Sequence, residues 1–212
     1  MAPNDLSEPS GLTLAGFAEP VFDSTAVFRT ALAAFSAPAT VLPMPAFSET
    51  PAGLNRTATA VLLTLLDMDT KLWLSDELDR AQVRDYFGFH TGCRFADAPG
   101  QCDFALCSAA EAAATARVLP VGTPEYPDRG ATLIVQVSGL TGGGESERRT
   151  FIGPGIQDRA ELSLPGLAPD FWTWFAQSKA LYPCGVDVLF AASDAIAALP
   201  RSSICSEDPS CT

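Results

Sequence analysis

The chain has 212 residues and a formal net charge of −12, because 25 Asp and Glu outnumber 13 Lys and Arg. Hydrophobic residues make up 47% of the sequence and charged residues 18%, which is typical of a folded globular domain and not of a disordered one. The acidic balance excludes a protein that binds duplex nucleic acid, since counterion release needs clustered Lys and Arg. It also argues against docking on anionic membranes.

The N-terminal segment shows no targeting signal. Residues 1–17 contain neither a basic region nor an apolar core of the kind that a secretory signal has. The longest apolar runs fall far short of the ~20 residues that a membrane helix needs. We therefore expect a cytoplasmic protein without a membrane span, in which the six cysteines are free thiols and not disulfides.

The first predicted elements are an arm, a helix and a short strand. Residues 1–20 are rich in Pro, Gly and Ser and are expected to form a mobile or draped arm. A helix follows, with Asp23 as its cap and Pro38 as its end. Its apolar residues recur at helical spacing: Val27, Phe28, Ala31, Leu32 and Phe35. Residues 40–42 then form a short strand.

A second helix, a strand and a third helix come next. The second helix runs from about residue 56 to residue 66, with Asn55 as its cap. Residues 71–74 are predicted to be a strand. Ser75 caps a third helix that ends near Gly88, and acidic residues in its first turn match the helix dipole.

The middle of the chain contains two buried strands. Residues 103–107 form the first, and Ser108 with Glu111 forms a capping box for the alanine-rich stretch that follows. Residues 131–137 are almost continuously apolar, which is typical of a central strand covered on both faces.

A hairpin is predicted after the second of these strands. A glycine-rich turn at 141–145 is expected to lead into a strand at 149–153 that returns antiparallel. The remaining elements are a helix opened by Pro169, strands at 186–191 and 196–199, and a polar tail from residue 202.

Alternating helices and strands with one hairpin predict an α/β fold, with helices on both faces of a mixed sheet. We divide the chain into an N-terminal arm at 1–20, a single α/β domain at 21–203 and a C-terminal polar tail at 204–212.

One short motif points to phosphatase chemistry. The sequence DMDT at 67–70 resembles the DxDxT motif of haloacid-dehalogenase-type phosphatases, in which two carboxylates hold Mg²⁺ and the first attacks phosphorus. No downstream motif plainly supplies the remaining metal ligands, although Asp187 and Asp194 are present. The alternative interpretation is a solvated turn, because the preceding apolar run reads as helix as easily as strand.

His90 is the only histidine in the chain. Histidine is the most frequent general base near neutral pH, but a hydrogen-bonded structural histidine is the competing interpretation. The cysteine spacings do not match a structural zinc site, so no metal site is predicted. We also find no catalytic constellation that is complete in itself, and no lysine in a context that indicates a Schiff-base cofactor.

Arginine outnumbers lysine, and Arg29 and Arg201 lie near the ends of predicted elements. Bidentate contacts to phosphate or phosphonate oxygens suit such arginines, although ion pairs with the surplus carboxylates are the alternative. On the last helix, Trp172 lies at the edge of an aromatic cluster and is a candidate for a protein contact.

Several motifs resemble, in order, one family: the H subunit of the bacterial carbon–phosphorus lyase system (PhnH). They cover about residues 17–203 and include LLTLLDMDT at 62–70, GATLIVQV at 130–137, GPGI at 153–156, YPCGVDVL at 182–189 and LPR at 199–201. Shorter matches stand at 28–29, 36–38, 72–75, 89–91 and 122–123. The chain departs from the family at Ala39, which follows Pro38 where the family often has Gly.

The resemblance implies a three-layer α/β/α domain similar to pyridoxal-phosphate-dependent transferases, but without the cofactor. It implies a homodimer in isolation and assembly with the G, I and J subunits. The G, H and I subunits together displace adenine from MgATP with an alkylphosphonate, which gives ribose 1-phosphonate 5-triphosphate. The iron–sulfur subunit J then breaks the C–P bond.

No catalytic residue is carried over from the family. If the chain has a ligand pocket, our candidates are Arg29, His90, Asp187 and Arg201, with the arginines holding an anionic group. Three functions thus compete: a structural subunit of the phosphonate-activating complex, a Mg²⁺-dependent phosphatase that uses Asp67, and a free-standing module that binds a phosphorylated metabolite.

Overall fold

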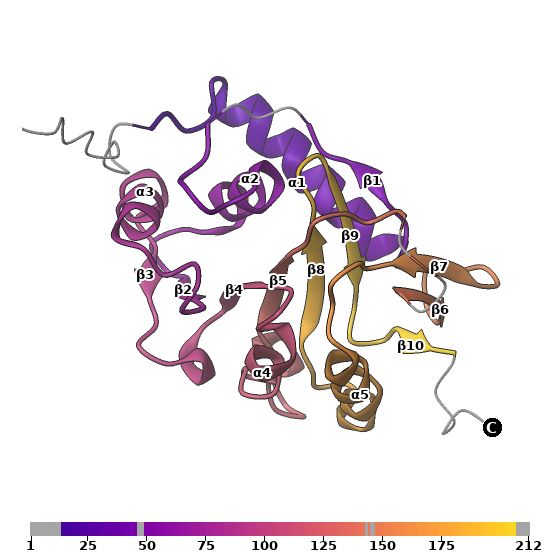
Figure 1. Ribbon diagram of the computed structural model, residues 1–212. Coiled ribbons are helices and arrows are strands. Elements are labelled where there is room, and N and C mark those ends of the chain that lie inside the picture. Colours follow the sequence, from indigo (N-terminus) through magenta and orange to yellow (C-terminus); the bar gives the residue numbers. More distant parts are fainter. Residues whose placement is uncertain (1–13, 46–48, 143, 145–146, 207–212) are drawn as a thin grey trace, which may run out of the picture.

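The computed structural model describes residues 14–45, 49–142, 144 and 147–206. Its centre is a seven-stranded sheet in the order β1-β9-β8-β5-β4-β2-β3 (Figure 1). The strands are β1 (Leu42–Pro43), β2 (Lys71–Leu74), β3 (Arg94–Phe95), β4 (Phe104–Ser108), β5 (Thr132–Gln136), β8 (Asp187–Ala191) and β9 (Ala195–Leu199). Five of these strands are parallel, while β9 runs antiparallel to β8 and β1 antiparallel to β9. The predicted mixed sheet is therefore confirmed.

Helices cover both faces of this sheet (Figure 1). One face carries α1 (Pro20–Ser36), α2 (Arg56–Leu65) and α3 (Ala81–Thr91), and the other carries α4 (Ala112–Ala116) and α5 (Pro169–Ser178). Short 3-10 turns lie at Pro99–Gln101, Pro127–Arg129 and Lys179–Leu181. Among the described residues, no helix is both long and apolar enough to cross a membrane.

The central strand shows why the core has two halves. Successive side chains of a strand point to opposite faces. In β5, Leu133 and Val135 join the cluster beneath α4 and α5, while Ile134 joins the cluster beneath α1 to α3. All three are completely buried, as their continuous apolar run predicts.

The predicted hairpin between residues 131–137 and 149–153 is wrong. Both edges of β5 are taken by parallel partners, β4 and β8. Instead, β6 (Arg148–Ile152) lies in a separate three-stranded sheet between β7 (Ala160–Ser163) and β10 (Ile204–Cys205). Part of the glycine-rich turn, at 143 and 145–146, lies outside the described residues. The segment that we assigned to the polar tail thus begins as a strand on β6.

Two of the predicted helix starts need correction. Helix α1 begins at Pro20, and the Asp23 carboxylate accepts the backbone N–H of Glu19 at 2.9 Å from inside the first turn. Helix α3 begins at Ala81 and not after Ser75, whose hydroxyl donates to the Glu111 carboxylate at 2.6 Å. The Asn55 cap is confirmed, since its Oδ1 accepts the N–H of Ala58 at 2.8 Å.

The departure from the family at Ala39 falls on unusual backbone. Ala39 has a φ of 61°, in the left-handed region that favours glycine. A glycine would adopt this conformation more readily than Ala39 does.

The cysteines within the described part of the chain are buried: Cys93, Cys102, Cys107, Cys184 and Cys205. Burial raises the pKa of Cys102 to about 12 and also raises that of Cys93. A thiol with a raised pKa is a poor nucleophile near neutral pH, so Cys93 and Cys102 act as small apolar core groups. Cys211 lies outside the described residues.

Candidate functional site

Two of the predicted site residues, Asp187 and Arg201, form an ion pair at the amino-terminal edge of the parallel strands. The antiparallel register of β8 and β9 sets Val188 opposite Leu199, so the residues just beyond this pair meet. The Arg201 guanidinium donates from Nη2 to Asp187 Oδ2 at 2.6 Å and from Nε to both carboxylate oxygens at 3.1 Å. The backbone N–H of Arg201 adds a fourth bond to Oδ1 at 2.8 Å. The Asp187 side chain is only 25% exposed and the Arg201 side chain only 16% exposed.

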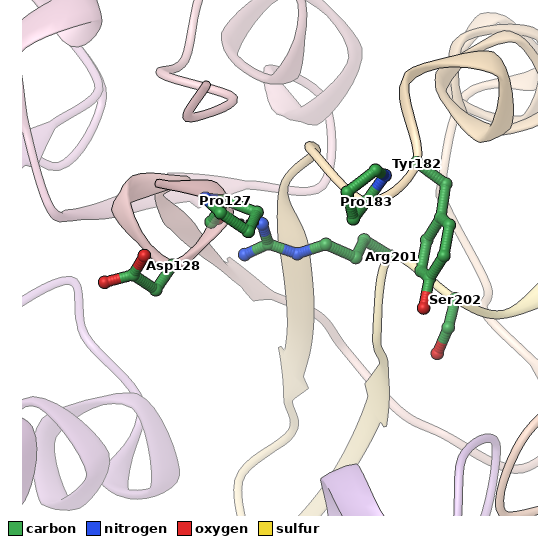
Figure 2. Close-up of a pocket in the computed structure, with 6 residues that line it drawn as sticks. All are labelled: Pro127, Asp128, Tyr182, Pro183, Arg201 and Ser202. Atoms are coloured by element: carbon green, nitrogen blue, oxygen red, sulfur yellow. Dashed lines mark hydrogen bonds between the residues drawn. The ribbon is translucent and has the colours of Figure 1, made fainter. Parts of the chain in front are cut away.

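The same guanidinium reaches a loop that is distant in sequence. Arg201 Nη1 donates to the carbonyl oxygen of Pro127 at 2.5 Å. Figure 2 shows the Arg201 side chain extending to Pro127. Arg201 also lines a hollow of about 320 Å³, whose walls are Pro127, Asp128, Tyr182, Pro183, Arg201 and Ser202. A neighbouring hollow of about 430 Å³ is lined in part by Asp187 and Ser202. The Asp187–Arg201 pair therefore joins two strand ends to the loop before β5 and borders both hollows.

Glycines allow this close packing. A Cβ on Gly130 would lie 2.2 Å from the carbonyl oxygen of Gly185 and 2.8 Å from Arg201 Nη1. A Cβ on Gly155 would lie 2.5 Å from the carbonyl oxygen of Ser36. These glycines come from separate motifs of the family resemblance, so the motifs converge on one packed region, which we call the amino-edge hub.

The chemistry available at the hub is pairing and not proton transfer. The guanidinium group has five N–H donors, and its bonds to Asp187 and Pro127 use at least three of them. At most two donors are left for an anion in the adjoining hollow. Binding of a ligand by Asp187 and Arg201 remains a prediction.

The other two predicted ligand-binding residues lie elsewhere. Arg29 is exposed on α1, where it lines a different hollow with Phe28 and Leu32. His90 lies near the end of α3 and donates from Nε2 to the carbonyl oxygen of Leu14 at 3.0 Å. The four residues thus do not form a single pocket.

His90 contacts the arm before α1. Gly16 lies on its imidazole ring, where an added Cβ would be 3.0 Å from Nδ1. Tyr86, one turn earlier on α3, donates from its hydroxyl to the carbonyl oxygen of Ala15 at 3.1 Å. These contacts fit the structural interpretation of His90, and they show that residues 14–17 of the predicted arm lie against α3.

Trp172 packs within its own domain. It is half-buried, and its ring centre lies 5.8 Å from that of Phe151. The guanidinium carbon of Arg149 lies 5.7 Å from the indole centre. The ring therefore bridges α5 and β6, and its role as a protein contact remains a prediction.

Asp67 lies in a turn that its own side chain stabilises. Its Oδ1 accepts the N–H groups of Asp69 and Thr70 at 2.9 and 3.0 Å. The turn follows helix α2 and precedes β2, so Asp67 lies at the amino end of a strand. The phosphatase hypothesis needs a nucleophile that follows a strand, and this position argues against it.

A second polar cluster lies at the carboxyl edge, and the sequence indicated its Ser108–Glu111 part but not the contact with Ser75. The Glu111 carboxylate accepts the hydroxyl of Ser75 at 2.6 Å, the hydroxyl of Ser108 at 2.9 Å and the N–H of Glu77 at 3.4 Å. Strand β2 leads to α3 on one face of the sheet and β4 leads to α4 on the other, so the cluster lies at the switch point where α/β proteins often bind ligands. Glu111 also accepts the backbone N–H of Ser108, which is the glutamate half of the predicted capping box. The Ser108 hydroxyl donates to Glu111 and so does not supply the other half.

The cluster makes Glu111 a stronger acid. Burial alone raises the pKa of Glu111, but the hydrogen bonds from Ser75, Ser108 and the backbone outweigh burial and lower it. A lowered pKa in the folded state stabilises the protein above the pKa of the unfolded chain, and this stabilisation is lost as the pH falls through the folded pKa.

We therefore expect Glu111→Gln to lower the free energy of unfolding by about 1–2 kcal/mol at pH 7. The difference from wild type should shrink as the pH falls below the ordinary pKa of a glutamate, because Glu111 of the wild type then becomes protonated as well. Urea denaturation of both proteins from pH 3 to pH 7 measures this difference. A constant difference across that range would show that the carboxylate charge has no role.

The protein is a mixed-sheet α/β domain in which the carboxylates of the described clusters are hydrogen-bonded to strands, turns and loops of the same chain. Asp187, Glu111 and Asp67 each accept several donors from the same chain.

Comparison with known proteins identifies the family. The profile of the family described as "Bacterial phosphonate metabolism protein (PhnH)" matches residues 15–206. The chain is 35% identical over 187 residues to the alpha-D-ribose 1-methylphosphonate 5-triphosphate synthase subunit PhnH of Rhizobium meliloti (strain 1021), covering 88% of this chain and 92% of that protein. It is 30% identical over 177 residues to the putative C-P lyase subunit protein HtxG of Stutzerimonas stutzeri, covering 83% and 82%. The chain belongs to the PhnH family.

Proposed function

We propose that this protein is the H-type subunit of a carbon–phosphorus lyase core complex that works in the cytoplasm in phosphonate catabolism. With the G and I subunits, it takes part in converting MgATP and an alkylphosphonate into ribose 1-phosphonate 5-triphosphate and adenine. The observation that carries this proposal is the family match over residues 15–206, together with a relative that is similar over nearly its whole length and is named as a synthase subunit.

Within the complex, the protein has a structural role and does not carry out the bond-breaking step. Asp187 and Glu111 each accept several hydrogen bonds from their own chain, which supports this role, because a general base or nucleophile needs a lone pair directed at the substrate. Its partners are the G, I and J subunits, and it forms a homodimer when isolated. The remaining N–H donors of Arg201 are our candidate for a contact with an anionic group.

We further propose that the fold is a cofactor-free relative of the pyridoxal-phosphate-dependent transferases. Helices on both faces of a mixed sheet support this comparison (Figure 1). The placement of the two lysines supports the loss of the cofactor. Lys71 begins β2 at the amino edge and Lys179 begins a short turn after α5, so neither follows a strand at the switch point.

Reconstitution tests the proposed function. Purified G and I subunits should release adenine from MgATP and methylphosphonate only when this chain is added, and the chain alone should release none. A tag on this chain should also recover the G, I and J subunits from co-expressing cells. Adenine release by G and I without this chain, or by this chain alone, would contradict the proposal.

A further inference from the structure

Helix α1 carries two apolar stripes. One consists of Val27, Ala31 and Ala34, which are buried against the core. The other consists of Val21, Thr25, Phe28 and Leu32, which we call the outer stripe. At 100° per residue its centre lies about 130° around the helix from the buried stripe. Its apolar members are well exposed: Val21 is 74% exposed, Phe28 49% and Leu32 55%. A surface helix with one partner needs only one apolar stripe, so the outer stripe lacks a partner in the isolated chain.

The spacing of the outer stripe indicates what covers it. Positions 21, 25, 28 and 32 are separated by four, three and four residues, which is the alternation of the a and d positions of a coiled coil. This interval pattern is the same in both directions along the helix. An antiparallel copy of α1 therefore matches it, with Val21 facing Leu32 of the second copy and Thr25 facing Phe28 of the second copy. The two-fold axis passes between positions 26 and 27.

The charges agree with pairing between identical copies. The groove beside the outer stripe contains no carboxylate, although the chain as a whole carries −12. It is about 470 Å³ in volume and is lined by Ser24, Thr25, Phe28, Arg29, Leu32 and Thr64. Phe22, which is 74% exposed, and Arg29 lie on the same flank of the stripe. Antiparallel pairing brings Arg29 close to Phe22 of the second copy, which is a favourable cation–π arrangement and occurs twice.

The exposed area is sufficient for the centre of an interface. Phe22 and Phe28 alone expose roughly 250 Å² for each copy, taking about 200 Å² for a whole side chain. A stable interface covers about 800 Å² per partner, so the stripe provides its apolar centre and the neighbouring residues of α1 and α2 provide its rim. The groove beside Thr64 gives space for side chains of the opposing helix.

We propose that the outer stripe of α1 is the homodimer surface, on which a second copy of this chain packs through its own α1 in antiparallel orientation. This inference rests on the homodimer in the proposed function and assigns that homodimer to one helix.

The first test measures mass in solution. Wild type and Phe28→Asp are compared by light scattering over a range of concentrations, with Val118→Asp as the control. Val118 is exposed to a similar extent, 52%, but follows α4 on the other side of the sheet. We expect wild type and Val118→Asp to be dimers and Phe28→Asp to be a folded monomer, as judged by circular dichroism.

Each other result overturns the inference. Dimers in all three proteins would place the homodimer on another surface, and a monomeric wild type would remove the homodimer. If Phe28→Asp stays dimeric but no longer recovers the G, I and J subunits, the stripe docks a companion subunit instead. None of these results decides the adenine-release experiment, so the proposed function stands or fails separately.

Cysteine cross-linking tests the antiparallel geometry independently of stability. Thr25→Cys lies on the stripe near the two-fold axis, while Ala26→Cys is also exposed but points about 100° away from Thr25 around the helix. A short bifunctional maleimide should join two copies of Thr25→Cys into a covalent dimer. All variants also carry Cys211→Ser, because Cys211 lies outside the described residues, whereas the cysteines within them are buried. In this background the reagent should not join Ala26→Cys or the protein without an added cysteine. Equal cross-linking of both variants, or of neither, would overturn the antiparallel arrangement.

Discussion

Arg201→Met is expected to lower the free energy of unfolding by about 3 kcal/mol, as measured by urea denaturation. Methionine fills much of the same space but removes the three side-chain bonds to the Asp187 carboxylate and the bond to the Pro127 carbonyl. The cost of a carboxylate left without its partner reaches 3–5 kcal/mol for fully buried pairs. Here partial exposure of the pair places the expected value at the lower end.

A surface ion pair provides the matched control. Arg148 and Glu161 approach to 3.5 Å, and both side chains are more than half exposed. Glu161→Gln should therefore change stability by less than about 1 kcal/mol. Arg201→Lys should fall between the two, because it keeps the charge but loses the planar donor fork. If Arg201→Met is no more destabilising than Glu161→Gln, the ion pair does not hold the hub together.

Elements whose signals are local could be predicted from the sequence. Asn55 caps α2 through an atom three residues away, and the apolar run of β5 reports burial on both faces without reference to other segments. Pairing between strands is not local. The antiparallel return of residues 149–153 looked favourable in sequence, but β8, more than fifty residues beyond β5, takes that edge.

The candidate site could likewise not be assembled from local signals. Asp187 and Arg201 were named separately for their chemistry, and only the β8–β9 register brings them together. The bond between Ser75 and Glu111 joins residues 36 positions apart, and no spacing rule indicates it.

The outer stripe of α1 escaped detection for a related reason. Phe28 and Leu32 recur at helical spacing with Val27 and Ala31, so the periodicity predicts an apolar helix. It does not tell which of two adjacent stripes faces the sheet.

Gly130→Ala is expected to destabilise the protein by about 3 kcal/mol or more, or to abolish soluble expression. The backbone of Gly130 has φ −68° and ψ 140°, which any residue adopts, so the effect does not come from backbone strain. It comes from one methyl group that would lie 2.2 Å from the carbonyl oxygen of Gly185. That oxygen belongs to the backbone, and it cannot move without displacing the start of β8 and the Asp187–Arg201 pair.

Gly100→Ala separates this steric effect from the general cost of losing a glycine. Gly100 lies on the surface, also without a positive φ, and an added Cβ would meet its nearest neighbour, the carbonyl oxygen of Val118, at an ordinary 3.5 Å. The free energy of unfolding of Gly100→Ala, measured by urea denaturation, should stay within about 0.5 kcal/mol of the wild-type value. Wild-type stability in Gly130→Ala would mean that the loop before β5 can move away from the hub. In that case Arg201→Met should also be mild, because both predictions depend on this loop being held against β8 and β9.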